Sequence, residues 1–290
     1  MPERRPNYQA RRVVVALVSL AVVGVLVLAG ILIARAVGGT TGDGPAAAPT
    51  TPGPSASPTP TPDAAAIAEA ERLAQEQAAA AQAAAEAEAA RQAMLAPGAC
   101  FGDPTTVTVL VNKHHPICPV DYYPDLVPVA STGGEMRPEA ADAMNAMNAA
   151  LEAETGLYLW HASGFRSYDT QVSTYGGWVD GYGQAEADRF SARPGHSEHQ
   201  LGLAMDVGAA SCGCTDEPFG YTTEGQWVAA NAWRFGYIVR YPEGYEWMTG
   251  YIWEPWHLRY VGPEIAAAMH DGGIATLEEY YGTPAAPDYP

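Results

Sequence analysis

The sequence predicts an α+β domain over residues 97–290, in which helices flank an antiparallel sheet. Two observations predict this class. Apolar residues recur on one helical stripe over 137–154, and a glycine follows the stripe, which is typical of an amphipathic helix. The runs 237–240 and 251–261 have the composition of strands and are joined by a segment that contains Pro and Gly, which favours an antiparallel pair.

The first 34 residues have the composition of a membrane anchor. Residues 1–12 carry four arginines, and residues 13–34 form an uncharged apolar run. About 22 residues at 1.5 Å each span a hydrocarbon core of roughly 30 Å, and the preceding arginines keep the N-terminus in the cytoplasm. We therefore expect a cytoplasmic tail and a single-pass transmembrane signal anchor, with the rest of the chain outside the cell membrane. A cleaved signal peptide is the alternative.

Two low-complexity segments follow the apolar run. Residues 35–62 consist mainly of Gly, Thr, Ala, Ser and Pro, a composition that buries no core and predicts a linker. Ala, Glu and Gln dominate residues 63–96, so helix propensity is high there, and Asp63 is suited to cap the helix. Because few apolar residues in this segment are larger than alanine, a solvated helical stalk is favoured over a coiled coil.

The other elements of the domain follow from local patterns. Residues 223–226 resemble a capping box that starts a helix through Arg234, which Gly236 ends. The segment 176–195 is rich in glycine and charged residues, which indicates a loop at the rim of a cleft. Shorter elements are expected in the remaining apolar runs: strands at 158–160 and 203–207, a helix at 263–270 and a closing segment at 276–281.

The charge balance limits the possible partners of the protein. A net charge of -18 and a single lysine, Lys113, argue against nucleic acid, because binding its phosphates requires a basic surface. The sequence leaves the oligomeric state open.

Four cysteines lie in the predicted domain, and export favours their oxidation. Three pairings are possible. We prefer Cys100 with Cys118 and Cys212 with Cys214, the second of which closes a small ring around Gly213. A metal site at Cys212 and Cys214 is the weaker alternative, because no second cysteine pair lies near them in the sequence.

Two histidines and two carboxylates stand in segments otherwise made of glycine, small apolar residues and tryptophan. Zinc in hydrolytic sites usually takes three protein ligands and keeps one position for water, and a further ionisable group accepts the proton of that water. His199, Asp206 and His257 are suited to be the ligands of one zinc ion, which leaves Glu254 as the general base.

The local sequence favours the convergence of these four side chains. Gly202 permits a sharp turn after His199, and the strand 203–207 then brings Asp206 back toward the histidine. Pro255 bends the second run, so that Glu254 and His257 need not point to opposite faces as in a regular strand.

Ser-x-His-x-x-Gly-x-Ala-x-Asp, which ends at Asp206, and Glu-x-Trp-His, which ends at His257, resemble motifs of the VanY-type D-alanyl-D-alanine carboxypeptidases. These enzymes belong to the zinc-peptidase superfamily that also includes lysostaphin-type enzymes and the hedgehog signalling domain. Upstream, the segment 163–171 is similar to the substrate-binding segment of the same family. The resemblance covers roughly residues 125–282 and excludes the first hundred residues and the cysteine pattern.

The resemblance implies a hedgehog/D-Ala-D-Ala-peptidase-like fold and a zinc enzyme that removes the terminal D-alanine from peptidoglycan stem peptides. Arg166 then stabilises the oxyanion, although a structural salt bridge is the alternative role for this side chain. Substrate contacts are expected from Ser197, Gln171 and Trp256.

Two alternatives stay open. An L,D-carboxypeptidase or a peptidoglycan endopeptidase would use the same residues. A non-catalytic cell-wall-binding module would keep the metal, but the presence of Glu254 speaks against it, since such a module needs no base.

Overall fold

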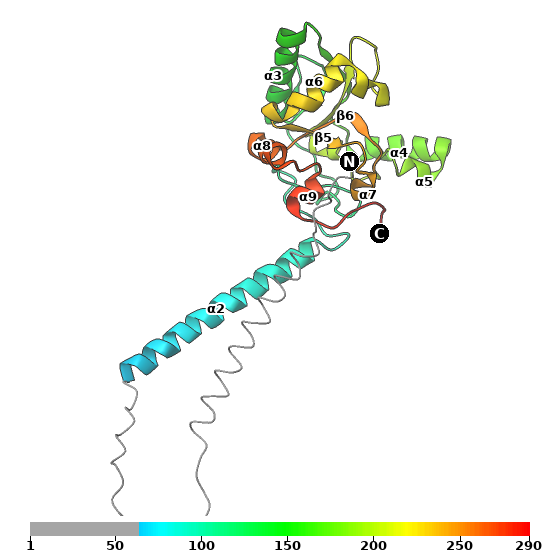
Figure 1. The fold of residues 1–290 in the computed structure, drawn as a ribbon. Coiled ribbons are helices and arrows are strands. Elements are labelled where there is room, and N and C mark those ends of the chain that lie inside the picture. Colours follow the sequence, from blue (N-terminus) through cyan, green and yellow to red (C-terminus); the bar gives the residue numbers. More distant parts are fainter. Residues whose placement is uncertain (1–63) are drawn as a thin grey trace, which may run out of the picture. The chain divides into compact units, whose positions relative to one another are not determined.

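Residues 64–290 are described by a computed structural model (Figure 1). The expected tail, anchor and linker at 1–62 lie outside this range, as does Asp63. Within the described range, no helix is both long and apolar enough to cross a membrane. Helix α2 spans Ala64–Met94, in the segment for which the sequence predicts a helix, and i,i+3 and i,i+4 ion pairs join Arg72 to Glu69 and Glu76 on its exposed surface.

The centre of the domain is a four-stranded antiparallel sheet in the order β3-β4-β6-β5. Its strands are β3 (Leu159–Ser163), β4 (Ala204–Ala209), β5 (Tyr237–Tyr241) and β6 (Glu254–Tyr260). A separate antiparallel pair is formed by β1 (Val127–Pro128) and β2 (Glu135–Met136). The α+β class with an antiparallel sheet is therefore confirmed.

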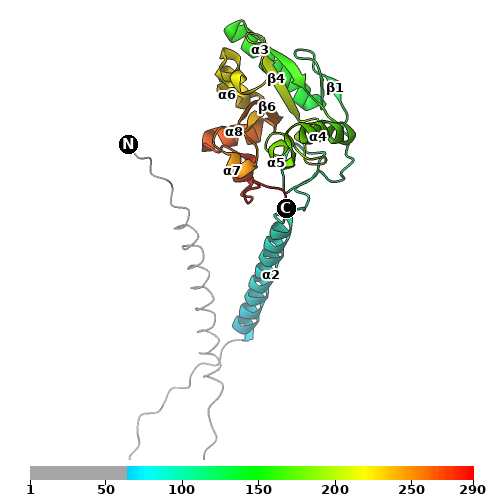
Figure 2. The same cartoon turned by 90° about the vertical axis from the view of Figure 1, so that its right-hand side faces the viewer.

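The helices of the domain are α3 (Pro138–Thr155), α4 (Tyr168–Tyr182), α5 (Gln184–Ala187), α6 (Thr223–Asn231), α7 (Glu246–Thr249), α8 (Pro263–Gly272) and α9 (Leu277–Tyr281). Most of them lie around the sheet, whereas α4 and α5 project from the side of the domain (Figures 1 and 2). The apolar stripe of α3, with Met144, Met147 and Leu151, is fully buried in a core that also contains Val207 of β4 and Leu258 of β6. Burial of this stripe fixes the helix on the sheet.

The expectation of a loop over 176–195 is wrong, because α4 occupies the first part of this segment and α5 follows it. The Ser167 side chain accepts a hydrogen bond from the Thr170 N–H and caps the start of α4. Each glycine inside the helix costs about 1 kcal/mol of helix stability relative to alanine. The surroundings do not require glycine, because a Cβ atom at Gly176, Gly177 or Gly181 would meet open space.

The expected capping box at 223–226 is also wrong. The capping residue is Thr222, one position earlier, and its hydroxyl accepts the Gly225 N–H. Glu224 is fully buried and accepts hydrogen bonds from the backbone N–H and the hydroxyl of Ser211. The glutamate therefore fixes the neighbouring loop instead of capping the helix. The helical run ends at Gly236, as expected, after a 3-10 turn.

All four cysteines lie in the described part of the chain and form the two expected disulfides, Cys100–Cys118 and Cys212–Cys214. The first closes a loop with a sequence separation of 18, and the second spans a separation of 2. Since a longer loop loses more conformational entropy when it is closed in the unfolded chain, the first disulfide should contribute more stability.

We expect the double substitution Cys100→Ser and Cys118→Ser to lower the free energy of unfolding by about 3 kcal/mol, and Cys212→Ser with Cys214→Ser to lower it by about 1 kcal/mol. Urea denaturation of the full chain measures both values. Equal losses in the two double variants would contradict the loop-entropy explanation.

Candidate metal centre and active site

The three expected ligands come from neighbouring elements of the sheet region. His199 lies in the 3-10 turn η1 (Glu198–Leu201), which ends at Gly202 with a φ of 68°. This left-handed conformation suits glycine and turns the chain directly into β4. In the ladder between β4 and β6, Asp206 is paired with His257. The fold therefore brings together the ligands that the sequence predicts.

The ligand atoms of these residues converge on one point. His199 Nε2 lies 3.2 Å from Asp206 Oδ2, and His257 Nδ1 lies 3.0 Å from Asp206 Oδ1. All three residues offer ligand atoms within 4.8 Å of one another. Although His199 Nε2 and Asp206 Oδ1 are buried, neither has a hydrogen-bond partner within the protein. Electron-pair donors that face one another in this way fit a metal cation.

The second nitrogen of each histidine is held by the protein. His199 Nδ1 lies 2.7 Å from the carbonyl oxygen of Gly164, and His257 Nε2 lies 3.4 Å from Glu198 Oε2. When these nitrogens donate their protons, His199 Nε2 and His257 Nδ1 are left with free lone pairs. Such outer contacts orient imidazole ligands and tune their basicity.

Burial lowers the pKa of His199 to about 4, so this ring is neutral at physiological pH, as a ligand must be. Burial also favours the neutral form of His257, but the neighbouring carboxylates of Asp206 and Glu198 raise its pKa to about 9. A metal ion has to displace the proton of His257 before it can bind there.

Glu254 lies on the same side of β6 as His257. Between the pairs Val239–Leu258 and Tyr241–Glu254, a two-residue step in β5 faces a four-residue step in β6, so β6 carries a bulge. The bulge contains Pro255 and confirms the expected bend. It places Glu254 Oε2 3.8 Å from His257 Nδ1.

Burial raises the pKa of Glu254 to about 8, and the charge of Asp206 adds to this effect. A bound cation would lower this pKa again by stabilising the carboxylate. Once a cation has removed its proton, Glu254 is free to accept one, as a general base does.

Arg166 also lies beside Asp206, with Nη2 3.6 Å from Asp206 Oδ2. Its Nη1 donates to Gln171 Oε1 at 3.1 Å, and Gln171 Nε2 donates to the carbonyl oxygen of Ala192 at 2.6 Å. Both polar atoms of the Gln171 side chain are thus hydrogen-bonded within the protein. The bond to Ala192 fixes the amide, and the amide oxygen in turn orients Arg166. A direct contact of Gln171 with substrate stays a prediction.

A cavity of about 490 Å³ opens above the ligands. Its lining includes every site residue expected from the sequence: Arg166, Gln171, Ser197, His199, Asp206, Glu254, Trp256 and His257. Other parts of the wall come from residues that the sequence analysis did not single out, among them Trp178, Phe190, Tyr241 and Tyr251. The roles of all these residues toward metal and substrate remain predictions.

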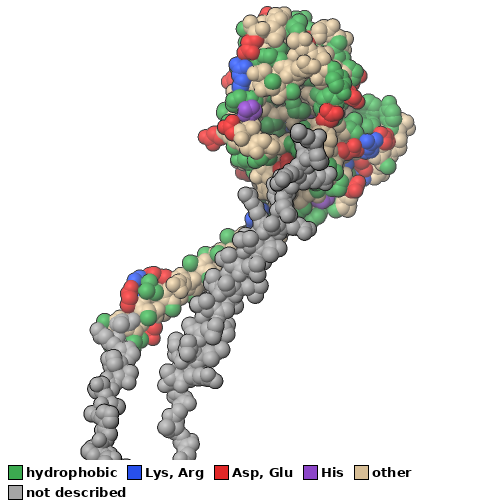
Figure 3. All heavy atoms as spheres, in the orientation of Figure 1, with side chains coloured by type: hydrophobic (Ala, Val, Ile, Leu, Met, Phe, Trp, Pro, Cys, Tyr) green, Lys and Arg blue, Asp and Glu red, His purple; other side chains and the backbone are tan. Residues whose placement is uncertain are grey.

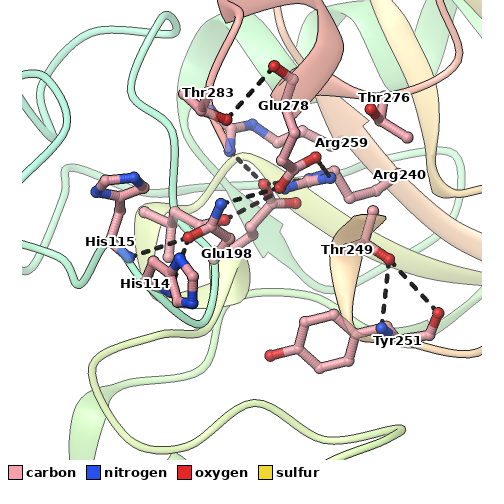
Figure 4. A network of polar contacts seen from close by, with 12 residues as sticks. His114, His115, Glu198, Arg240, Thr249, Tyr251, Arg259, Thr276, Glu278 and Thr283 are labelled. Carbon is pink, nitrogen blue, oxygen red and sulfur yellow. Dashed lines mark hydrogen bonds and ion pairs between the residues drawn. The ribbon is translucent and has the colours of Figure 1, made fainter. Parts of the chain in front are cut away.

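Glu198 also lines this cavity and was not singled out by the sequence analysis. It is 1% exposed, and its Oε1 accepts hydrogen bonds from Arg240 Nε at 2.9 Å and Arg259 Nη1 at 2.7 Å (Figure 4). Burial works against the carboxylate, but Arg259 and Arg240 hold the pKa of Glu198 well below its usual range. An ionised Glu198 can accept the proton of His257 Nε2 in a hydrogen bond. The signal in the sequence was a glutamate beside a proposed ligand and two arginines in predicted strands.

The matches to known proteins fit this geometry. The family model described as VanY, D-alanyl-D-alanine carboxypeptidase, matches residues 133–263. YodJ of Bacillus subtilis (strain 168) is 41% identical over 189 residues, which cover 62% of this chain and 68% of YodJ. The chain belongs to the VanY family. Like other members of this family of zinc peptidases, it is a carboxypeptidase and therefore a hydrolase.

A second VanY-family relative, a D-alanyl-D-alanine carboxypeptidase of Enterococcus faecalis (strain ATCC 700802 / V583), is 36% identical over 185 residues. The match covers 60% of this chain and 65% of that protein, so the chain spans about two thirds of the length of both relatives.

Solved structures of other carboxypeptidases also match. The LD-carboxypeptidase LdcB has a TM-score of 0.58 at 41% identity, over 62% of this chain and 88% of LdcB. VanYB in complex with D-alanine-D-alanine has a TM-score of 0.54 at 34% identity, over 61% of this chain and 98% of VanYB. A VanY D,D-pentapeptidase variant in complex with Zn(II) has a TM-score of 0.53 at 33% identity, and the match covers 60% of this chain and 98% of that chain.

Zinc binding is expected to release about two protons from the protein at pH 7. His257 and Glu254 have pKa values raised to about 9 and about 8, so each holds a proton at neutral pH, which a bound cation expels. The apparent affinity for zinc therefore rises with pH up to about 9. Calorimetric titration in buffers with different ionisation enthalpies counts the protons. The variant Glu254→Gln should release about one, and release of none by the wild type would contradict the assignment.

Glu198→Gln should weaken zinc affinity by about 10- to 100-fold, because a neutral amide supports His257 less well than a carboxylate. Glu278→Gln is the matched control, since it removes an equal charge from Arg240 and touches none of the ligands. Competition with a coloured chelator measures both affinities. Equal losses in the two variants would show that Glu198 acts through stability alone.

Proposed function

We propose that this protein is a zinc-dependent D-alanyl-D-alanine carboxypeptidase that removes the terminal D-alanine from peptidoglycan stem peptides. The observation that carries the proposal is the convergence of His199, Asp206 and His257, with Glu254 3.8 Å from His257 Nδ1. The Zn(II) complex of a VanY relative and the D-alanine-D-alanine complex of VanYB support the choice of metal and substrate.

The residues of the chain divide the reaction among them. When bound by His199, Asp206 and His257, zinc supplies a Lewis acid that polarises a carbonyl group and acidifies a water molecule. Glu254 accepts the proton of that water and passes it to the leaving amine, a role that its position 3.8 Å from His257 Nδ1 suits. Arg166, oriented by Gln171, places a guanidinium beside Asp206, where it can stabilise negative charge on the carbonyl oxygen.

An L,D-carboxypeptidase is the second candidate. LdcB, named as an LD-carboxypeptidase, has a higher sequence identity and TM-score than VanYB. Both activities release a terminal D-alanine and differ in the residue that precedes it, so the same metal, base and arginine serve both.

We also propose that the enzyme acts outside the cell membrane, tethered by residues 13–34. This location rests on the sequence of the N-terminal segment. It is supported by the two disulfides, because disulfides form and persist in oxidising compartments.

Incubation of the zinc-loaded full chain with a pentapeptide stem and with a tetrapeptide stem tests the activity. We expect loss of one D-alanine from the pentapeptide, seen by mass spectrometry, and a much slower reaction with the tetrapeptide. A preference for the tetrapeptide would establish the L,D activity instead.

Glu254→Gln is the control, since it keeps the shape of the side chain and removes the base. It should bind zinc and lose nearly all turnover, because general-base catalysis contributes about 10²- to 10⁴-fold. Turnover near the wild-type rate in this variant would overturn the role of Glu254.

A further inference from the structure

The catalytic cavity continues onto an exposed cluster of three aromatic side chains. Trp178 and Phe190 line the same cavity as the metal ligands, and Tyr182 lies beside them. Trp178 is 41% exposed and Tyr182 is 62% exposed. We call Trp178, Tyr182 and Phe190 the aromatic ledge. Figure 3 shows hydrophobic side chains gathered where α4 and α5 project from the domain, at the right-hand edge of the view.

The ledge is a built surface, because its rings brace one another. Trp178 and Phe190 meet edge to face, with ring centroids 5.3 Å apart and an angle of 90° between the rings. Tyr182 meets Phe190 at 5.7 Å and 84°. Such edge-to-face contacts hold the rings in position while a large apolar area stays in water, and exposed apolar patches beside a cavity usually mark a binding surface.

The position of the ledge along α4 defines which part of the substrate can reach it. Gln171, Trp178 and Tyr182 follow one face of the helix, and Gln171 contacts Arg166 at the site. At 1.5 Å per residue, Trp178 lies roughly 10 Å and Tyr182 roughly 16 Å along the helix from Gln171. A carboxypeptidase releases a single residue, so a surface this long can contact only the substrate on the other side of the scissile bond.

Three or four residues of a stem peptide precede the scissile bond, and they span roughly 10 to 14 Å when extended. The stem then joins a sugar of the glycan strand through its N-terminus. The lengths therefore place that sugar at the ledge when the scissile bond lies at the ligands. The apolar C–H face of a sugar ring fits the electron-rich face of Trp or Tyr.

The charges around the ledge favour an uncharged sugar over an anionic lipid surface. The α4–α5 segment exposes Asp169, Asp180 and Glu186, and Arg189 is paired with Glu186 and Glu246. Anionic membranes attract clusters of lysine and arginine, which this segment does not carry.

We propose that the aromatic ledge is a glycan subsite, which binds the sugar that carries the stem peptide. This inference rests on the proposed function, since it extends the same substrate beyond the cavity. The enzyme then prefers stems that are still attached to glycan, which directs it to the wall and its precursors and away from free peptides.

The test compares the cleavage of two substrates by the zinc-loaded full chain: a free stem peptide and the same stem attached to its disaccharide. For the wild type we expect kcat/KM to be about tenfold higher on the disaccharide-linked stem, the factor that burial of roughly 55 Å² of apolar surface supplies. In Trp178→Ala this ratio should fall to near one. Trp247→Ala is the matched control, because Trp247 is 59% exposed and lies outside the catalytic cavity, and it should keep the wild-type ratio.

A wild-type ratio near one, or an unchanged ratio in a folded and zinc-loaded Trp178→Ala variant, would overturn the glycan subsite and leave the ledge to a protein or lipid partner. Failure of the proposed function gives a different result, namely no cleavage of either substrate. In that case calorimetry measures the affinity of the Glu254→Gln variant for the free stem peptide and for the disaccharide-linked stem. Equal affinities would overturn the subsite, and tighter binding of the disaccharide-linked stem would support it.

Discussion

A buried cluster of four charges stabilises the domain and its candidate metal centre. The side chains of Glu198, Arg240, Arg259 and Glu278 have no solvent exposure, and the two acids balance the two arginines. The cluster joins η1, β5, β6 and α9, and Arg259 Nη2 also donates to the carbonyl oxygens of Val107 and Val109. Removal of one member of such a network leaves an unpaired buried charge, which typically costs about 3–5 kcal/mol. The cluster therefore contributes strongly to holding together segments that are far apart in the sequence.

The cluster also couples stability to chemistry through Glu198. This residue precedes the expected ligand His199 in the chain, and its Oε2 lies 3.4 Å from Nε2 of the expected ligand His257. Because Arg240 and Arg259 keep Glu198 ionised, the carboxylate can fix the orientation of the His257 ring without taking its proton. A chain with a net charge of -18 thus concentrates two arginines behind its proposed metal site. Their charge offsets that of Glu198 and limits the build-up of negative charge behind a cavity that must admit the terminal carboxylate of a peptide.

The residues expected to be ligands could be picked out from the sequence because each stands in a short motif of characteristic residue types. Gly202 and the strand after it bring Asp206 back to His199 over a few residues, and Pro255 explains the bulge beside Glu254. The charge cluster left no comparable pattern, since Glu198 pairs with arginines that are 42 and 61 residues away. Helix α4 was missed for another reason. Its glycines lower helix propensity, but the Ser167 cap and the packing of Gln171 and Trp178 outweigh this local preference.

Under the proposed function, catalysis and substrate selection lie on different elements of the fold. The ligands, the base and Glu198 belong to β4, β6 and η1, which the charge cluster fixes from behind. Other walls of the cavity come from outside the sheet: Trp178 from α4, Phe190 from the segment after α5, and Thr215 from beside the Cys212–Cys214 disulfide. Changes in these walls alter which stem fits without moving the metal ligands. A D,D-carboxypeptidase and an L,D-carboxypeptidase can therefore share one catalytic centre and differ only in the residues that surround it.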